Sequence, residues 1–170
     1  MLTTTKQISI NGIGIALFVT LAMCLRVPVF ENYYLCLGYV VMAIYCYSIG
    51  TLQGTLISTL GVMLYCLLIN GLRGMPGWAI GNIAIGIIIG LGFGLSKKVK
   101  NQFLSYIICI LAIVIGTAVG ILGIKSCVEC ILYAQPFFLR TANNIYAFVA
   151  DVVVLIASLP ICKILDNKIK

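Results

Sequence analysis

Six long apolar segments constrain this chain more than any other feature. They cover about residues 8–25, 33–49, 52–70, 77–95, 104–124 and 142–165. A helix of about 20 apolar residues is long enough to cross the ~30 Å hydrocarbon core of a bilayer. Only 9% of the residues are charged and 62% are hydrophobic. A water-soluble domain of this size could not cover its surface with so few charged residues. The sequence therefore predicts an all-α integral membrane bundle of six transmembrane helices, forming a single domain over residues 1–170.

The polar chemistry available inside such a bundle is limited. Histidine is absent, and the acidic residues are Glu31, Glu129, Asp151 and Asp166. The absence of histidine excludes Ser-His and Cys-His catalysis, histidine metal sites and histidine proton relays. The chain also has no soluble segment large enough for an ATPase or a nucleic-acid module. We therefore expect a protein that is not an enzyme and that carries no cofactor and no catalytic metal.

Basic residues at the segment ends predict the orientation of the bundle. One side would hold seven lysines, at positions 6, 97, 98, 100, 163, 168 and 170, and the other would hold Arg26, Arg73, Lys125 and Arg140. By the positive-inside rule, the richer side is cytoplasmic. We thus expect a multi-pass protein of the plasma membrane with both termini in the cytoplasm. Polar and aromatic residues then concentrate in the outer connections, as in a protein that captures a solute from outside.

The fourth segment, GWAIGNIAIGIIIGLGFG, contains a stripe of unusual residues. Trp78, Asn82, Gly86, Gly90 and Gly94 are spaced by four and share one helix face. The glycines would let a second helix approach closely, while Trp78 and Asn82 would face an outward pocket. Alternatively, the tryptophan is an interfacial anchor and the asparagine forms a bond between helices.

The sixth segment contains an ionisable residue. Asn144 and Asp151 are seven positions apart and share a face, with Tyr146 beside them. An acidic residue at this depth is a functional candidate by default. It could contact a ligand amine or hydroxyl, or pair with Arg140 or Arg73. The alternative is a structural hydrogen bond from a protonated carboxyl group to a neighbouring helix.

The first segment contains small residues at the same spacing. Gly12, Ala16 and Thr20 form a smooth strip, which could be a docking face for another membrane protein or an internal packing face.

Eight cysteines are present, and Cys127 and Cys130 form a CVEC motif in an outer connection. Such a pair also permits a membrane thiol oxidoreductase as an alternative function. It does not make a zinc site, because two further ligands are missing on that side.

These features together resemble the substrate-binding S component of an energy-coupling-factor (ECF) vitamin transporter. The likeness is closest in three stretches, KQISINGIGIALFVTLAMCLRVPV, LGYVVMAIYCYSIGTLQGTLISTLGVMLYCLLING and PGWAIGNIAIGIIIGLGFGL. Their order is similar to the riboflavin-transporter-type group of this family. The second half of the chain is similar in length and in the polar residues that begin its sixth span.

The resemblance implies a function and a set of partners. An S component binds a vitamin at its outer end and has no ATPase of its own. It docks on an ECF module made of a membrane scaffold subunit and two ATP-binding subunits. The family's docking motif on helix 1 is Ala-x-x-x-Ala. Ala16 matches one alanine of that motif. Gly12 and Thr20, four residues before and after it, stand where the second alanine would be.

The resemblance also suggests which residues would bind the vitamin, because the family uses its outer loops and the outer halves of helices 4 to 6. The predicted substrate-binding residues are Asn82, Trp78, Asp151, Asn144, Tyr146, Arg73, Tyr33 and Glu129. Rings such as those of Trp78, Tyr34 and Phe137 could also stack on a flat heterocycle. The subgroup favours riboflavin, while pyridoxine, thiamine, pantothenate and their precursors stay open. A stand-alone secondary transporter or channel, coupled through Asp151, is a further alternative.

Overall fold

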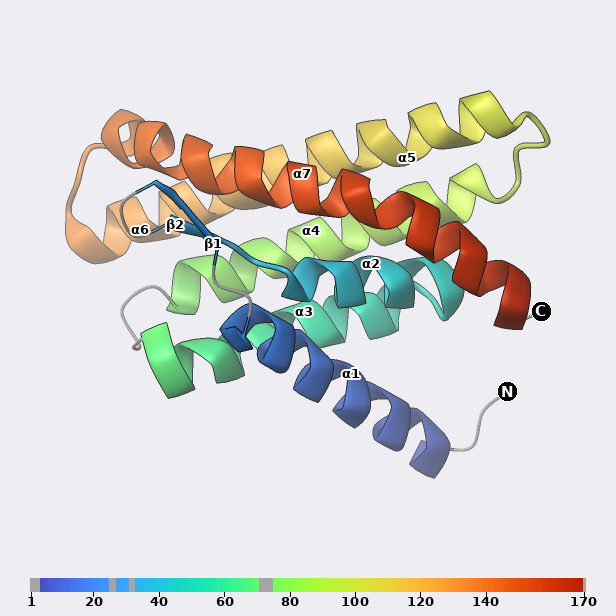
Figure 1. Ribbon diagram of the computed structural model, residues 1–170. Helices are drawn as coiled ribbons and strands as arrows, with labels where there is room; N and C mark the ends of the chain where they lie inside the picture. The colour runs from blue at the N-terminus through green and yellow to red at the C-terminus, as the bar shows by residue number, and fades with distance from the viewer. Residues whose placement is uncertain (1–3, 25–26, 31–32, 71–74, 170) are drawn as a thin grey trace.

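The computed structural model describes residues 4–24, 27–30, 33–70 and 75–169 (Figure 1). Within these residues the chain is helical except for one small hairpin and short connections. The helices are α1 (Thr4–Cys24), α2 (Gly38–Ser48), α3 (Thr51–Tyr65), α4 (Met75–Ser96), α5 (Gln102–Thr117), α6 (Ser126–Tyr133) and α7 (Phe137–Ile169). Two π-helical stretches, η1 (Cys66–Asn70) and η2 (Ala118–Lys125), continue α3 and join α5 to α6. The hairpin consists of the antiparallel strands β1 (Val27–Phe30) and β2 (Tyr33–Leu35).

This architecture confirms the prediction of an α-helical membrane bundle. Five helical stretches in the described part of the chain are long and apolar enough to cross a bilayer. The helix α2, with 11 residues, is the shorter sixth member. Both ends of the chain lie at one end of the bundle, together with the α4–α5 connection, while the hairpin and α6 lie at the opposite end (Figure 1).

Two predicted boundaries were wrong. The segment at 33–49 was expected to be helical throughout, but it begins as strand β2 and becomes helical only at Gly38. The connection at about 125–141 was expected to be a long loop with room for a short helix of its own, and a short helix, α6, is present there but is not separate. Instead the fifth helix continues without a break through η2 and α6 to Tyr133. Aromatic side chains favour the strand, and Pro136 follows the end of α6, where a helix cannot easily continue.

The glycines of α4 explain how the helices pack. A Cβ atom at Gly86 would lie 2.7 Å from the Cα atom of Thr55, and one at Gly90 would lie 2.8 Å from the Cα atom of Thr51. The backbones of α3 and α4 are therefore in direct contact, as the glycine spacing predicted. Gly94 was expected to belong to the same contact, but nothing lies within 4 Å of its Cβ position.

A second close approach joins α4 to η2. A Cβ atom at Gly81 would lie 2.6 Å from the carbonyl oxygen of Gly120, and the reverse contact is equally tight. With a glycine on each side, the two backbones meet without side chains between them. This contact brings η2 next to the end of α4 that lies on the same side of the bundle as the hairpin.

The core lies among α1, α2, α3, α4, α5 and α7, and its largest fully buried side chains include Tyr39, Phe18, Phe93 and Met42. Large apolar side chains such as Leu91, Leu95 and Leu111 are instead exposed on the outer faces of the helices. That distribution suits a bundle surrounded by lipid, which is as apolar as the core itself.

Candidate functional site

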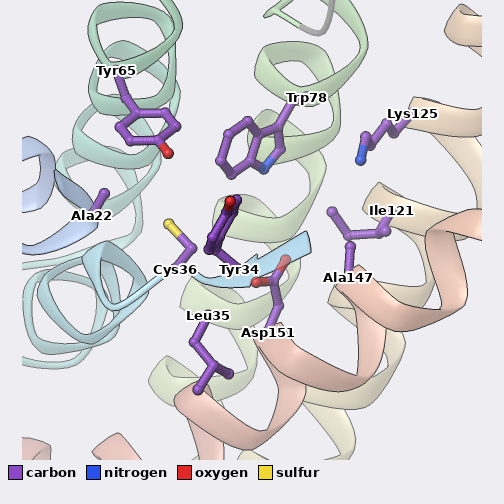
Figure 2. A pocket seen from close by; sticks show the side chains of 10 residues that line it. All are labelled: Ala22, Tyr34, Leu35, Cys36, Tyr65, Trp78, Ile121, Lys125, Ala147 and Asp151. Carbon is purple, nitrogen blue, oxygen red and sulfur yellow. The ribbon is translucent and has the colours of Figure 1, made fainter. Parts of the chain in front are cut away.

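A cavity of about 130 Å³ opens beneath the hairpin (Figure 2). The hairpin lies at the end of the bundle opposite the termini (Figure 1). Side chains from β2, α1, α3, α4, η2 and α7 meet around it, so positions far apart in the sequence form one wall. The lining residues are Ala22, Tyr34, Leu35, Cys36, Tyr65, Trp78, Ile121, Lys125, Ala147 and Asp151. The lining is mostly apolar and aromatic with two charged groups, the usual composition of a small-molecule site.

The indole of Trp78 is fixed in place at this cavity. Its Nε1 donates a hydrogen bond of 2.9 Å to the hydroxyl of Tyr39, which is fully buried. The ring of Tyr65 packs edge-on against the indole, with the centroids 5.8 Å apart. A rigid aromatic wall of this kind costs little conformational entropy when a flat ring binds against it.

Asn82 lies one helical turn below Trp78 and supports it. Its Nδ2 donates a hydrogen bond of 2.8 Å to the carbonyl oxygen of Trp78, and the side chain is fully buried. Its Oδ1 accepts no hydrogen bond from the described residues, although the Tyr39 hydroxyl lies close by. A buried polar atom without a partner is costly, and the nearby hydroxyl of Tyr39 is the donor that can satisfy this oxygen.

Asp151 brings a carboxyl group to the cavity from α7. The residue is 4% exposed and, among the described residues, forms no hydrogen bond and no ion pair. Its side chain points into the cavity toward Tyr34 and Trp78 (Figure 2). A buried carboxylate without a partner is expensive, and a ligand donor would remove that cost.

Lys125, the last residue of η2, brings the opposite charge. Its Nζ donates a hydrogen bond of 2.9 Å to Oδ1 of Asn144 and lies 3.9 Å from Oε1 of Glu129. The Nδ2 group of Asn144 donates to Oγ of Ser126 at 3.0 Å and to Oε2 of Glu129 at 3.1 Å. This polar cluster of Lys125, Ser126, Glu129 and Asn144 ties η2 and α6 to α7 beside the cavity.

The predicted site residues fall into three groups. Trp78 and Asp151 line the cavity. Asn82, Asn144 and Glu129 are buried directly behind it.

The remaining predicted residues do not line the cavity or cannot be placed. Tyr146 is 40% exposed and Phe137 is 37% exposed, and neither is part of the cavity wall. Arg73 and the side chain of Tyr33 lie outside what the structure describes.

Sequence reasoning missed Lys125, Tyr65 and Cys36 as lining residues. Lys125 was counted as a charge in an outer loop, because the fifth apolar segment was expected to end there. The available signal was a basic and an acidic residue four apart, Lys125 and Glu129, which places both on one face of a continuing helix. Tyr65 and Cys36 carried no distinguishing pattern.

The CVEC motif is separate from the cavity lining. Cys127 and Cys130 lie on α6 as free thiols, and the other described cysteines are also free. No group of three or more potential metal-ligating side chains occurs among the residues that the structure describes.

Comparison with known proteins gives the family. The model of the "ECF-type riboflavin transporter, S component" family matches residues 2–167. A solved structure described as the "S-component for biotin from an ECF-type ABC transporter" superposes with a TM-score of 0.66. The superposition covers 98% of this chain and 95% of the biotin S-component chain, and the two sequences are 17% identical. At that identity the likeness shows a shared fold. No curated protein sequence matches the chain.

The match over nearly all of the sequence confirms the predicted family and, with it, a role in transport. S components associate with a membrane scaffold subunit and ATP-binding subunits of ECF transporters. The chain belongs to the family of S components of ECF-type riboflavin transporters, the membrane-embedded subunits that capture the substrate of these importers.

Proposed function

We propose that the cavity beneath the hairpin is the vitamin-binding site and that its ligand is a flat heterocyclic vitamin, with riboflavin as the first candidate. The observation that carries this proposal is the buried carboxyl group of Asp151, which has no hydrogen bond or ion pair with the residues that the structure describes and faces the fixed indole of Trp78 across the cavity. The indole offers a stacking surface for a ring, and the carboxylate accepts a hydrogen bond from an N–H or O–H group. The name of the matching family supports the choice of riboflavin.

The proposed orientation places this cavity on the outside of the plasma membrane and both termini in the cytoplasm. Three lysines, Lys97, Lys98 and Lys100, follow α4 at the end of the bundle where the chain begins and ends (Figure 1). The positive-inside rule makes that end cytoplasmic. The cavity lies at the opposite end and would receive its ligand from outside.

A thermal-shift screen of the detergent-purified protein tests this function. Riboflavin, thiamine, pyridoxine, pantothenate, biotin and their precursors would be tested separately. A ligand present at about 100 times its Kd stabilises a protein by about 2.7 kcal/mol. We expect a clear rise of the melting temperature with riboflavin.

Each other result has a distinct meaning. A response to a different vitamin, with none to riboflavin, contradicts the proposed ligand while leaving the cavity as the site. Silence across the whole panel, from a protein that melts cooperatively, contradicts the vitamin-binding role of the cavity.

We also propose that the strip of Gly12, Ala16 and Thr20 on α1 contacts the membrane scaffold subunit. All three residues are exposed, and a Cβ atom at Gly12 would meet nothing within 4 Å. The hydroxyl of Thr20 is bonded to the carbonyl oxygen of Ala16 at 2.8 Å, so the strip presents no free donor. A smooth face of small residues permits close helix–helix contact.

Replacing Ala16 with leucine should separate binding from transport. We expect vitamin uptake to fall at least about tenfold, which corresponds to ~1.4 kcal/mol of lost association, while the Kd of the isolated subunit for the vitamin is unchanged. Uptake is measured in cells that also express the ECF scaffold and ATP-binding subunits. Ala142→Leu, at an exposed alanine on α7, is the matched control. Equal uptake by the two variants would contradict the assignment.

A further inference from the structure

Lys125 and Asp151 bring a basic and an acidic side chain to the same cavity, yet no ion pair joins them. Both line the cavity and point into it, Lys125 from η2 and Asp151 from α7 (Figure 2). In the part of the chain that the structure describes, the ion pair that Lys125 makes is with Glu129, at 3.9 Å, and Asp151 makes none. A basic and an acidic group attract each other strongly in a medium of low dielectric constant when both are ionised, so the contacts that position the lysine matter for the site.

Asn144 supplies one of these contacts. Its Oδ1 accepts the hydrogen bond from Lys125 Nζ at 2.9 Å, which fixes the ammonium on the α6 side of the cavity. The orientation of the amide is set by its other end, where Nδ2 faces Oγ of Ser126 and Oε2 of Glu129. A carboxylate accepts hydrogen bonds and does not donate them. The NH₂ group must therefore face Glu129, which leaves the amide oxygen for the lysine.

The backbone around Lys125 restricts it further. A Cβ atom at Gly77 would lie 3.2 Å from the Lys125 carbonyl oxygen and 3.4 Å from its Cγ, so α4 packs directly on the stem of the side chain. Asn144 itself is 2% exposed and does not line the cavity. It acts on the site through Lys125.

We propose that Asn144, oriented by Glu129, is a positioning residue that keeps Lys125 from pairing with Asp151. The cavity therefore offers a donor and an acceptor as two separate groups. The ligand class that fits is a flat ring with an amide or imide edge, in which a ring carbonyl accepts from Lys125 and the adjacent N–H donates to Asp151. This inference rests on the proposed function for the ligand, and on the polar cluster alone for the role of Asn144.

Keeping Lys125 and Asp151 apart favours selection among ligands as well as affinity. If the two groups were paired, a ligand would have to break their ion pair before it bound. Held apart, they are preorganised for the ring edge. A ring that lacks the N–H would leave Asp151 buried without a partner, and such a mismatch is the strongest basis for rejecting an analogue.

A ligand-free double-mutant cycle tests the positioning role. Lys125→Met and Asp151→Asn are made singly and together, in the natural chain and in Asn144→Leu, and the melting temperature of each detergent-purified protein is measured. We expect the two substitutions to be close to additive in the natural chain. In Asn144→Leu they should be clearly non-additive, because the released lysine pairs with Asp151. Asn143→Leu, at the exposed neighbouring position, should behave like the natural chain.

The opposite pattern overturns the role of Asn144. If the deviation from additivity is equal in the two backgrounds, or larger in the natural chain, Asn144 does not hold Lys125 and Asp151 apart. If Asn144→Leu does not fold, Asn144→Ser removes the amide but leaves a polar group for Ser126 and Glu129, and the same comparison applies.

A matched pair of flavins tests the ligand class. Riboflavin and its N3-methyl derivative differ in the N–H of the imide edge. We expect the methylated compound to bind the natural chain at least about tenfold more weakly, and to be discriminated less in Asn144→Leu. Equal affinity for the two compounds overturns the assignment of the ring edge. If neither binds, the ligand class fails together with the proposed riboflavin ligand, whereas the double-mutant cycle still decides the role of Asn144.

Discussion

Asp151→Leu lowers the affinity for the vitamin by about 10- to 100-fold, which is the largest effect on binding that we expect from a single substitution. A hydrogen bond to a charged group contributes about 1.5–3 kcal/mol, and each 1.4 kcal/mol is a factor of about ten in Kd. Because Asp151 has no hydrogen bond or ion pair among the described residues, its removal leaves none of those residues without a partner. The substitution should therefore spare the fold, and the loss should appear in the Kd measured by titration calorimetry.

Two further variants sharpen this result. Asp151→Asn keeps the size and an acceptor oxygen but removes the charge, so we expect an intermediate loss of affinity. Asn143→Leu changes an exposed polar residue of the same helix and should leave the Kd within about twofold of the natural value. An Asp151→Leu protein that folds and binds as tightly as Asn143→Leu would exclude Asp151 from the ligand site.

Gly86→Val destabilises the bundle strongly, whereas Gly94→Val does not. The two positions belong to the same stripe of α4, eight residues apart, but differ in their surroundings. A Cβ atom at Gly86 would lie 2.5 Å from Oγ1 and 2.7 Å from Cα of Thr55, while one at Gly94 would meet nothing within 4 Å. A Cα atom cannot rotate away as a side chain can, so α3 and α4 would have to separate. Overpacking of a tight contact costs about 1–3 kcal/mol or more.

The measurement is the difference in melting temperature between the two valine variants in the same detergent. Both carry the same intrinsic cost or gain of valine in a helix, so the comparison isolates the contact with Thr55. If Gly86→Val has the same melting temperature as Gly94→Val, the helices tolerate a larger separation. The glycine spacing then does not determine the packing of α4.

The properties of the proposed site depend on how Lys125 and Asp151 are placed relative to each other. In the proposed site, Lys125 is engaged by Asn144 and Glu129, and Asp151 is left for the ligand. A site of this type is poorly satisfied when empty and becomes satisfied when the ligand binds.

Much of the fold follows from the sequence because hydropathy and helical periodicity are local properties. The apolar segments predicted the membrane bundle, and the four-residue spacing of Gly86 and Gly90 predicted their close contact with another helix. The same spacing placed Trp78 and Asn82 next to each other, and their hydrogen bond joins them in the structure. Asp151 was identified because an acidic residue inside a span has few structural reasons to be there.

Spacing on one helix could not show which helix lies opposite. Gly94 continues the stripe but meets no neighbour, because the partner helix α3 begins at Thr51, which packs against Gly90. Tyr146 shares a helix with Asp151 yet is 40% exposed, since the face that meets the cavity is set by how α7 packs. Hydropathy also could not distinguish a strand from the start of a helix at Tyr33–Leu35, because three apolar residues fit either structure.

The sequence by itself determined that this chain is a membrane bundle of the S-component family, with Trp78 and Asp151 among its candidate binding residues. Only the tertiary structure decided that Lys125 belongs to the same cavity as Asp151 and that Asn144 and Glu129 hold it there. The physical reason is that the free energy of transfer of an apolar segment into lipid depends on that segment alone, so it can be read from the sequence. A polar cluster instead depends on distances between helices, which are fixed by glycine contacts such as that between Gly81 and Gly120.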